Sequence, residues 1–214
     1  AIHITREVAE DSIQRKAVVY DRDEEGHYDT ISAFIKSVRG SDPDAAVYWL
    51  QLMIEAGEDP EFVARRLVIL ASEDVGLADP AALGIAVDAA RALQFVGLPE
   101  AAYALHHAAL YLALAPKSNS VTRAIGAARD AVRSRATTEV PMHLRGTGYP
   151  GAEQLGHGAG YRYPHDAQGS VIRQQYLPDD LKDVILYRPG NLGEEAELAE
   201  QQAVADEVLG KKRE

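Results

Sequence analysis

The chain has 214 residues, of which 46% are hydrophobic and 26% are charged, and its formal net charge is −11. A chain of this length buries roughly 70% of the surface that it exposes when unfolded, so it can form a core without metals or disulfides. It has no cysteine, which excludes disulfides, thiolate nucleophiles and cysteine-ligated zinc and fits a reducing cytosol. The negative charge argues against unaided coating of duplex DNA, because non-specific binding requires Lys and Arg to neutralise phosphates.

The two ends of the chain give further expectations. Charged residues interrupt the longest apolar runs, and the N-terminus has no basic region followed by an apolar one. We therefore expect no membrane span and no signal peptide. The first residue is Ala1 rather than Met, and residues 1–20 resemble the end of a structural element, so we expect a piece of a longer protein. Within them a short helix is predicted over 4–16, with Thr5 as its N-cap, and an acidic linker follows at 21–27.

Between residues 28 and 116 an Asp-Pro pair recurs at 42–43, 59–60 and 79–80. Aspartate is a good N-cap, and proline suits the first turn of a helix because its missing N–H has no intrahelical partner there. Each pair therefore predicts a helix start. A helical solenoid would also give such spacing, but the apolar positions do not align as a repeat, which favours an ordinary bundle.

The expected helix ends and apolar stripes complete this prediction. Gly40, Gly57 and Gly97 are expected to end helices in the left-handed conformation. Apolar residues at helical spacing predict about five antiparallel helices. The predicted core stripes are Ile31, Phe34, Ile35 and Val38; Val47, Leu50 and Ile54; Phe62, Leu67 and Leu70; Leu83, Val87, Ala90 and Leu93; and Leu105, Ala109 and Leu112.

Alanine-rich stretches at 81–92, 101–115 and 124–131 allow close helix packing. They also bury little apolar area per residue, so burial against a partner subunit would add stability. This composition is a first indication of self-association.

The later part of the chain has a different character. Lys117-Ser118-Asn119-Ser120 is expected to cap a helix that runs to about Arg135. Residues 140–193 are rich in Gly, Pro and Tyr with little periodicity, and their aromatic content favours an ordered, irregular arm over disorder. A polar, acidic helix or tail follows at 194–214. The predicted fold class is all-α, a helical bundle with a long irregular arm.

Segment 117–182 is the one stretch with a clear positive charge, nine Lys and Arg against six Asp and Glu. Exposed cations beside aromatic rings are typical of single-strand nucleic-acid surfaces, although the same tyrosines could instead fix the arm to the bundle. The candidate phosphate contacts are Lys117, Arg123, Arg129, Arg133, Arg145, Arg162 and Arg173, and the candidate aromatic cluster is Tyr161, Tyr163 and His165.

The sequence has no catalytic nucleotide or nucleophile motif. A phosphate loop is absent, since the only Gly-Lys, at 210–211, lacks both the earlier glycine and the hydroxyl residue. Residues 146–151 match G-x-G-x-x-G, but Pro150 and further glycine follow where a helix should begin. No G-x-S-x-G elbow is present.

The histidines give no metal-ligand spacing. His106 and His107 are consecutive on a predicted helix and point about 100° apart, which favours packing. His143, His157 and His165 could converge with Asp166 or Glu153, but the spacing matches no known class of site. We expect no catalytic, cofactor or metal residue in this chain.

Several long stretches resemble the C-terminal region of the RarA/MgsA family (replication-associated recombination protein A, with eukaryotic relatives that interact with the Werner helicase). The similarity is collinear over nearly the whole chain and is weakest after Tyr187. The stretches are HYDTISAFIKSVRGSDPDAAVYWL (27–50), FVARRLVILASEDVGLADPAAL (62–83), YLALAPKSNSVTRAI (111–125), VPMHLR (140–145), LGHGAGYRYPHD (155–166) and QQYLPDDLKD (174–183).

The resemblance implies a non-catalytic, all-α C-terminal domain, similar in role to the collar of clamp-loader subunits, that holds an AAA+ ATPase in a homotetramer. Residues 1–20 then correspond to the last helix of the AAA+ lid, and 28–193 to the oligomerisation domain. ATP and Mg²⁺ are expected only in a module that precedes Ala1. The implied partners are single-stranded-DNA-binding protein and fork or duplex-end DNA, in the cytoplasm and associated with the nucleoid.

Two hypotheses from different classes result. The first is an oligomerisation domain of an ATPase that acts at stalled replication forks. The alternative is a nucleic-acid or partner-protein docking module that uses segment 117–182. The candidate docking residues are Lys117, Arg123, Arg145, Tyr161, Arg162, Tyr163, His165 and Arg173.

Overall fold

The structure is a computed structural model that describes residues 24–134 and 139–213. Within those ranges the regular elements are seven α-helices, one π-helical turn and five 3₁₀ turns, with no strand, which confirms the all-α fold class. The helix predicted over 4–16 lies outside the described residues. The chain divides into two compact units, Ala1–Ser118 (unit 1) and Asn119–Glu214 (unit 2).

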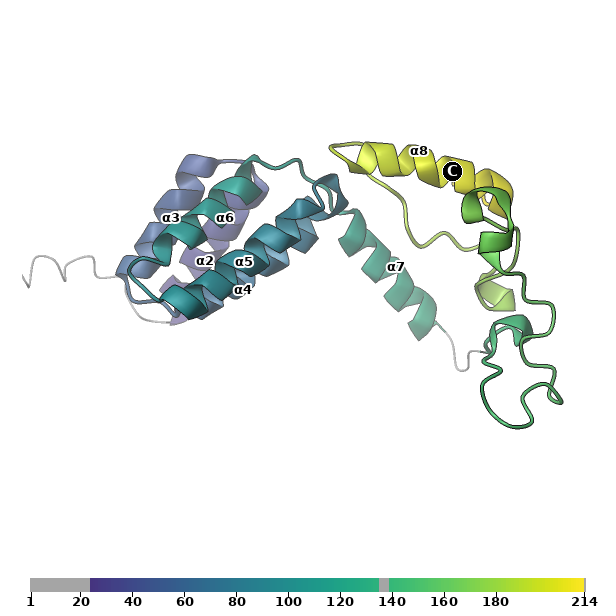
Figure 1. Cartoon of the computed structure of the whole chain (residues 1–214). Helices are drawn as coiled ribbons and strands as arrows, with labels where there is room; N and C mark the ends of the chain where they lie inside the picture. The colour runs from purple at the N-terminus through teal and green to yellow at the C-terminus, as the bar shows by residue number, and fades with distance from the viewer. Residues whose placement is uncertain (1–23, 135–138, 214) are drawn as a thin grey trace, which may run out of the picture. The chain divides into compact units, whose positions relative to one another are not determined.

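The described part of unit 1 is a bundle of five helices, the number that the sequence predicts (Figure 1). Helix α2 packs on α3, α3 on α6, α4 on α5 and α5 on α6. Helix α2 begins at Glu24, within residues 21–27, where the sequence predicted an acidic linker. The helices are α2 (Glu24–Arg39), α3 (Pro43–Glu55), α4 (Pro60–Leu70), α5 (Ala81–Val96) and α6 (Ala102–Leu114).

The Asp-Pro pairs at 42–43 and 59–60 start helices as predicted, with the aspartate as N-cap, whereas the pair at 79–80 lies just before α5, whose N-cap is Pro80. The Asp42 carboxylate accepts a hydrogen bond from the Ala45 N–H at 2.9 Å, and Asp59 accepts one from Glu61 at 2.9 Å. Asp79 accepts from the Ala81 N–H at 3.1 Å, and its second oxygen accepts a 2.6 Å bond from the Tyr111 hydroxyl. Each pair therefore precedes a helix, and the predicted cap arrangement holds at two of the three.

Two of the three predicted glycine caps are wrong. At the end of α2 the left-handed residue is Ser41 (φ 60°) and not Gly40, because the chain reverses one residue later and the Asp42 N–H bonds to the Ser37 carbonyl. Gly97 has a positive φ of 76° but an extended ψ of 164°, since the chain leaves α5 in an extended direction. Gly57 has the predicted positive φ, 75°.

The core of unit 1 contains the large side chains that the sequence indicates, including Phe34, Leu50 and Leu67, all fully buried. The stripe predicted on α5 is confirmed in part, since Leu93 is buried and Ala90 packs against the core, but Leu83 does not belong to the buried face. Leu83 is 44% exposed, and the buried face is instead lined by Ala82, Ala86, Ala89 and Leu93. Small residues face inward because α5 packs against both α4 and α6, and short side chains let these helices approach closely.

Unit 2 contains α7 (Ser120–Arg133), α8 (Glu195–Leu209) and the irregular arm between them. The arm holds four 3₁₀ turns, at Met142–Leu144, Pro164–Asp166, Gln168–Ser170 and Asp179–Leu181, and it confirms the predicted irregular segment. Its buried apolar side chains are Ala152 and Ile172. No helix in the described ranges is long and apolar enough to cross a membrane.

Candidate functional site

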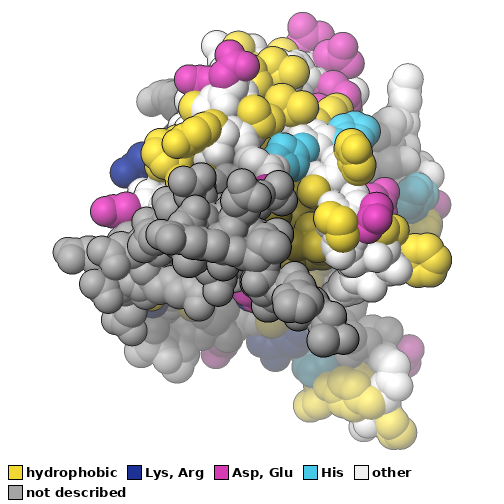
Figure 2. Space-filling model, turned by 90° about the vertical axis from the view of Figure 1, so that its left-hand side faces the viewer, with side chains coloured by type: hydrophobic (Ala, Val, Ile, Leu, Met, Phe, Trp, Pro, Cys, Tyr) yellow, Lys and Arg dark blue, Asp and Glu magenta, His cyan; other side chains and the backbone are white. Residues whose placement is uncertain are grey.

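An open hollow of about 1000 Å³ lies over α3 and α6 of unit 1. Its lining is mostly apolar or aromatic, and we call it the apolar hollow. Figure 2 shows hydrophobic side chains in yellow beside histidine side chains in cyan on the upper part of the view. The lining of the hollow includes Gln51, Pro99, Tyr103, His106, Leu110 and Leu114, with Glu100 as the one carboxylate that the described residues contribute.

The composition of α6 accounts for the apolar hollow. Its thirteen residues include no Asp, Glu, Lys or Arg. One face, with Leu105 and Leu112, is buried in the bundle, yet on the opposite face Tyr103 is 84% exposed and Leu114 is 70% exposed. A helix that is apolar all round is typically buried on all sides, so this outer face is suited to a further contact.

Further exposed apolar residues stand at the end of α5. Phe95 is 92% exposed, Val96 is 53% exposed and Leu98 is 39% exposed, directly before Pro99 of the hollow. None of these residues is among those predicted from the sequence. The signal that could have found them is the continuation of apolar residues around both faces of two consecutive helices.

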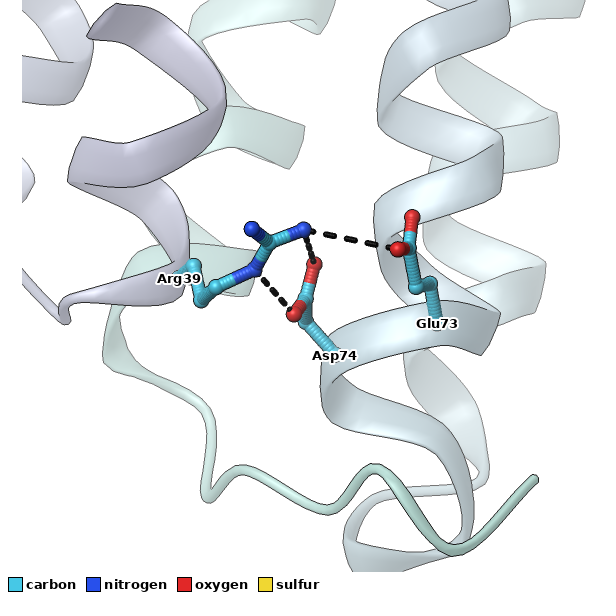
Figure 3. Close-up of polar contacts among 3 residues, drawn as sticks. All are labelled: Arg39, Glu73 and Asp74. Carbon is cyan, nitrogen blue, oxygen red and sulfur yellow. Dashed lines mark hydrogen bonds and ion pairs between the residues drawn. The ribbon is translucent and has the colours of Figure 1, made fainter. Parts of the chain in front are cut away.

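An ion pair fixes the end of α2 to the π-helical turn Ala71–Val75 (Figure 3). The Arg39 Nε donates to Asp74 at 2.5 Å, and a guanidinium nitrogen lies 3.4 Å from Glu73. The bond to the nearly buried Asp74 carboxylate raises the pKa of Arg39. The Asp74 carbonyl also accepts from the Ser118 N–H at 2.8 Å, so this turn holds the last residue of unit 1.

Lys117, the first predicted docking residue, lies at the end of α6. Its ammonium donates to the Ala113 carbonyl at 2.9 Å and to the Ala115 carbonyl at 2.6 Å. Burial lowers the pKa of Lys117. The side chain thus satisfies carbonyls at the helix C-terminus, which is a structural role.

The predicted arginines of unit 2 lie on different elements. Arg123 is on α7 and donates to the Arg188 carbonyl at 3.4 Å. Arg145 donates to the Val140 carbonyl at 2.8 Å, with Glu139 at 3.9 Å. The Arg145 contact is local, whereas the Arg123 contact joins α7 to a residue 65 positions later in the chain.

The aromatic cluster in the arm is exposed. Tyr161 is 46% and Tyr163 is 54% exposed, and the Tyr163 ring lies 5.0 Å from the His165 ring, centroid to centroid. The backbone of Arg162 exchanges two hydrogen bonds with the Gln174 amide, at 2.9 and 3.3 Å. These rings therefore remain available to a ligand. The hydrogen bonds to Gln174 place them beside the segment that carries Arg173.

Arg173 lines a second hollow, of about 560 Å³, in unit 2. Lys182, Lys211 and Lys212 line it too, and the one carboxylate in its wall is Asp183. We call it the basic hollow, defined by Arg173, Gln174, Tyr176, Lys182, Lys211 and Lys212. Of these four cations, only Arg173 was predicted from the sequence to be a docking residue, because the lysines come from other parts of the chain.

The histidines of the arm have separate partners. His143 bonds to the Gln175 carbonyl, His157 to the Tyr149 hydroxyl and His165 to Ser170. Across the described ranges, no three His, Asp or Glu side chains converge as metal ligands.

The nucleotide-like sequence patterns do not form a phosphate cradle. The G-x-G-x-x-G residues 146–151 are followed by turns and not by a helix. The Gly-Lys at 210–211 follows α8, with Gly210 as its left-handed C-cap, so its N–H groups do not open a helix. Neither of these two patterns therefore has the geometry of a phosphate-binding loop.

A buried polar cluster, which we call the clasp, holds the chain end in unit 2. The Tyr187 hydroxyl donates to Glu195, which is fully buried, at 2.8 Å, and Arg213 donates to both Asp206 and the Tyr187 carbonyl. Burial and the bond to Glu195 raise the pKa of Tyr187 to about 12. The Arg213 hydrogen bond lowers the pKa of Asp206, and Lys211 acts in the same direction.

The described fold is an all-helical bundle with an apolar outer face, followed by an irregular arm and two further helices. The family profile described as "MgsA AAA+ ATPase C terminal" matches residues 40–205, and one described as "AAA C-terminal domain" matches 1–39. The chain therefore belongs to the RarA/MgsA family of AAA+ ATPases and corresponds to its C-terminal region.

The chain is similar to several proteins along nearly its whole length. The chain is 50% identical to an uncharacterized AAA domain-containing protein of Mycobacterium tuberculosis over 98% of its length and 46% of the relative's. It is 44% identical to replication-associated recombination protein A of Bacillus subtilis, over 99% of the chain and 49% of the relative. It is 41% identical to the ATPase WRNIP1 of Dictyostelium discoideum, over 85% of this chain and 21% of the relative. The chain spans about half the length of the first two.

Proposed function

We propose that this chain assembles an AAA+ ATPase of DNA replication and recombination into a homo-oligomer, with the apolar hollow as the subunit contact. The observation that carries the proposal is the outer face of α6, which has no charged side chain and leaves Tyr103 and Leu114 exposed. The proposal assigns ATP and Mg²⁺ to the other half of the relatives' length.

A second copy of the chain is the occupant that best matches the surface. Unit 1 presents both halves of a contact, the apolar hollow and, outside its lining, the 92% exposed Phe95. A protruding ring on one subunit and a hollow on the next make a head-to-tail contact, which closes into a ring when the rotation allows. A stable contact of this kind buries about 1,000 Å² or more.

Helix α2 supports a coupling role for the bundle. It lies within residues 1–39, which match the AAA C-terminal domain profile, yet its Phe34 and Val38 are buried in the same core as α3 to α6. The Arg39–Asp74 pair joins the last residue of that match to the MgsA match. A rotation of the AAA+ lid would thus carry the whole bundle, and the subunit contact, with it.

The experiment compares two aspartate substitutions by light scattering coupled to size exclusion. Leu114→Asp places a charge in the apolar hollow, and Val132→Asp makes the same kind of change on α7; both side chains are 70% exposed. We expect Leu114→Asp to lower the mass of the assembly and Val132→Asp to leave it unchanged. Equal effects, or none from Leu114→Asp, would contradict this assignment of the interface.

A second candidate function is a docking module for nucleic acid or a partner protein on segment 117–182. The observation in its favour is the exposure of Tyr161 and Tyr163 on either side of Arg162. Its test is titration of the full chain with single-stranded DNA at low salt, in which absence of binding rejects the nucleic-acid form of this candidate.

A further inference from the structure

We propose that the basic hollow of unit 2 binds the phosphates of a single-stranded nucleic acid and that Tyr176 stacks on one of its bases. The inference deepens the second candidate function and rests on it. It also moves the centre of binding away from the predicted segment, because half of the cations come from the chain end after α8.

The fold brings the four cations together from three places. Arg173 is in the arm, Lys182 follows the 3₁₀ turn Asp179–Leu181, and Lys211 and Lys212 follow α8. Gly210 makes this approach possible. It has a φ of +71°, and a Cβ at this position would lie 3.3 Å from an Arg173 guanidinium nitrogen.

The charge of the basic hollow is open to a ligand. In the described part of the chain, no ion pair joins Arg173, Lys182 or the two lysines at 211–212 to a carboxylate. Arg213, the next cation along, forms the ion pair with the nearby Asp206, and Lys211 adds to the stabilisation of that carboxylate without pairing with it. Four cations against one lining carboxylate, in a chain of net charge −11, mark a site for a polyanion.

The aromatic residues favour a single strand. Tyr176 lines the basic hollow and is 42% exposed, and the Gln174 amide holds its hydroxyl at 3.0 Å. The same amide bonds to the Arg162 backbone, which lies between Tyr161 and Tyr163. Exposed rings can stack on unpaired bases, whereas duplex bases already stack on one another.

The experiment measures binding of fluorescent oligo(dT) to the full chain across a salt series. Contact of four cations with phosphates predicts a slope of log affinity against log salt of about −3. The variant Lys211→Ala/Lys212→Ala should reduce that slope by about 1.4 and weaken binding about tenfold. The matched control, Lys36→Ala/Arg91→Ala, removes two exposed cations of unit 1 and should bind as the unmodified chain does.

A second pair of variants tests the stacking. Tyr176→Leu should weaken binding by about tenfold, and Tyr176→Phe, which keeps the ring, should stay within about twofold of the unmodified chain. Oligoglutamate serves as a competitor that shares the negative charge without the bases. Displacement of oligo(dT) by oligoglutamate at equal charge, together with normal binding by Tyr176→Leu, would overturn the nucleic-acid assignment.

The outcomes separate the proposals. If the Lys211→Ala/Lys212→Ala variant binds oligo(dT) as the unmodified chain does, this inference is overturned. The binding site would then lie elsewhere on segment 117–182. No binding by the unmodified chain overturns both this inference and the nucleic-acid form of the second candidate. The mass of each sample from light scattering reports oligomerisation independently of either result.

Discussion

Unit 1 buries a continuous apolar core across five helices, whereas unit 2 has Ala152 and Ile172 as its buried apolar side chains and holds its chain end through the clasp. The surfaces differ in the same way. The face that unit 1 leaves uncovered is apolar, and the hollow of unit 2 is basic. Apolar surface suits a permanent contact and cations suit a reversible one, so the two units are suited to different roles.

The largest expected effect is the loss of core packing in unit 1. Leu67 is fully buried, so Leu67→Ala should lower the free energy of unfolding by about 2–5 kcal/mol through lost transfer energy and a residual cavity. The chain has one tryptophan, Trp49 on α3, which packs against this core. Its fluorescence in a denaturant series measures the change, and Leu67→Met, expected to cost less than about 1.5 kcal/mol, is the control.

A smaller effect is expected from opening the clasp of unit 2. Arg213→Ala leaves the Asp206 carboxylate without its strongest partner, which should cost about 2 kcal/mol. Hydrogen exchange of the α8 amides gives the local readout, with the exposed neighbour substitution Lys212→Ala as control. Equal protection of α8 in both variants would show that the clasp does not stabilise unit 2.

The smallest effect concerns pH. The Arg213 bond lowers the folded-state pKa of Asp206, so the unfolded chain binds the proton more readily. The ionised Asp206 carboxylate stabilises the folded state in full above the pKa of an unfolded aspartate, about 3.9. This stabilisation disappears as pH falls through the lower pKa that Asp206 has in the folded state. On acidification, the amide NMR signals of folded α8 should therefore weaken in the unmodified chain. The Arg213→Ala variant should lack this pH-dependent loss. An unchanged acid response in that variant would assign the effect to other carboxylates.

The structural features that the sequence predicted correctly depend on residues that are close together in the chain. Asp42 and Asp59 cap their helices as expected because a cap involves only the next few residues. The orientation of α5 could not be read in this way, since hydropathy favoured Leu83 while close packing between helices selected Ala82 and Ala86. The turn at Ser41 was missed because a serine rarely adopts a positive φ, so the sequence favoured the neighbouring Gly40.

The candidate surfaces show the same division. Tyr161 and Arg173 were identified from local composition. Lys211 and Lys212 were not assigned to the docking surface because their proximity to Arg173 depends on the path of the whole unit. The outer face of α6 had a readable signal, thirteen residues without a charge, which points to burial on both sides.

The most direct test of the central claim is the mass of the unmodified chain in solution. Light scattering coupled to size exclusion across a concentration series should give a mass near four times the 23.2 kDa of one chain. A mass of 23.2 kDa that persists at micromolar and higher concentrations would contradict self-assembly through the apolar hollow.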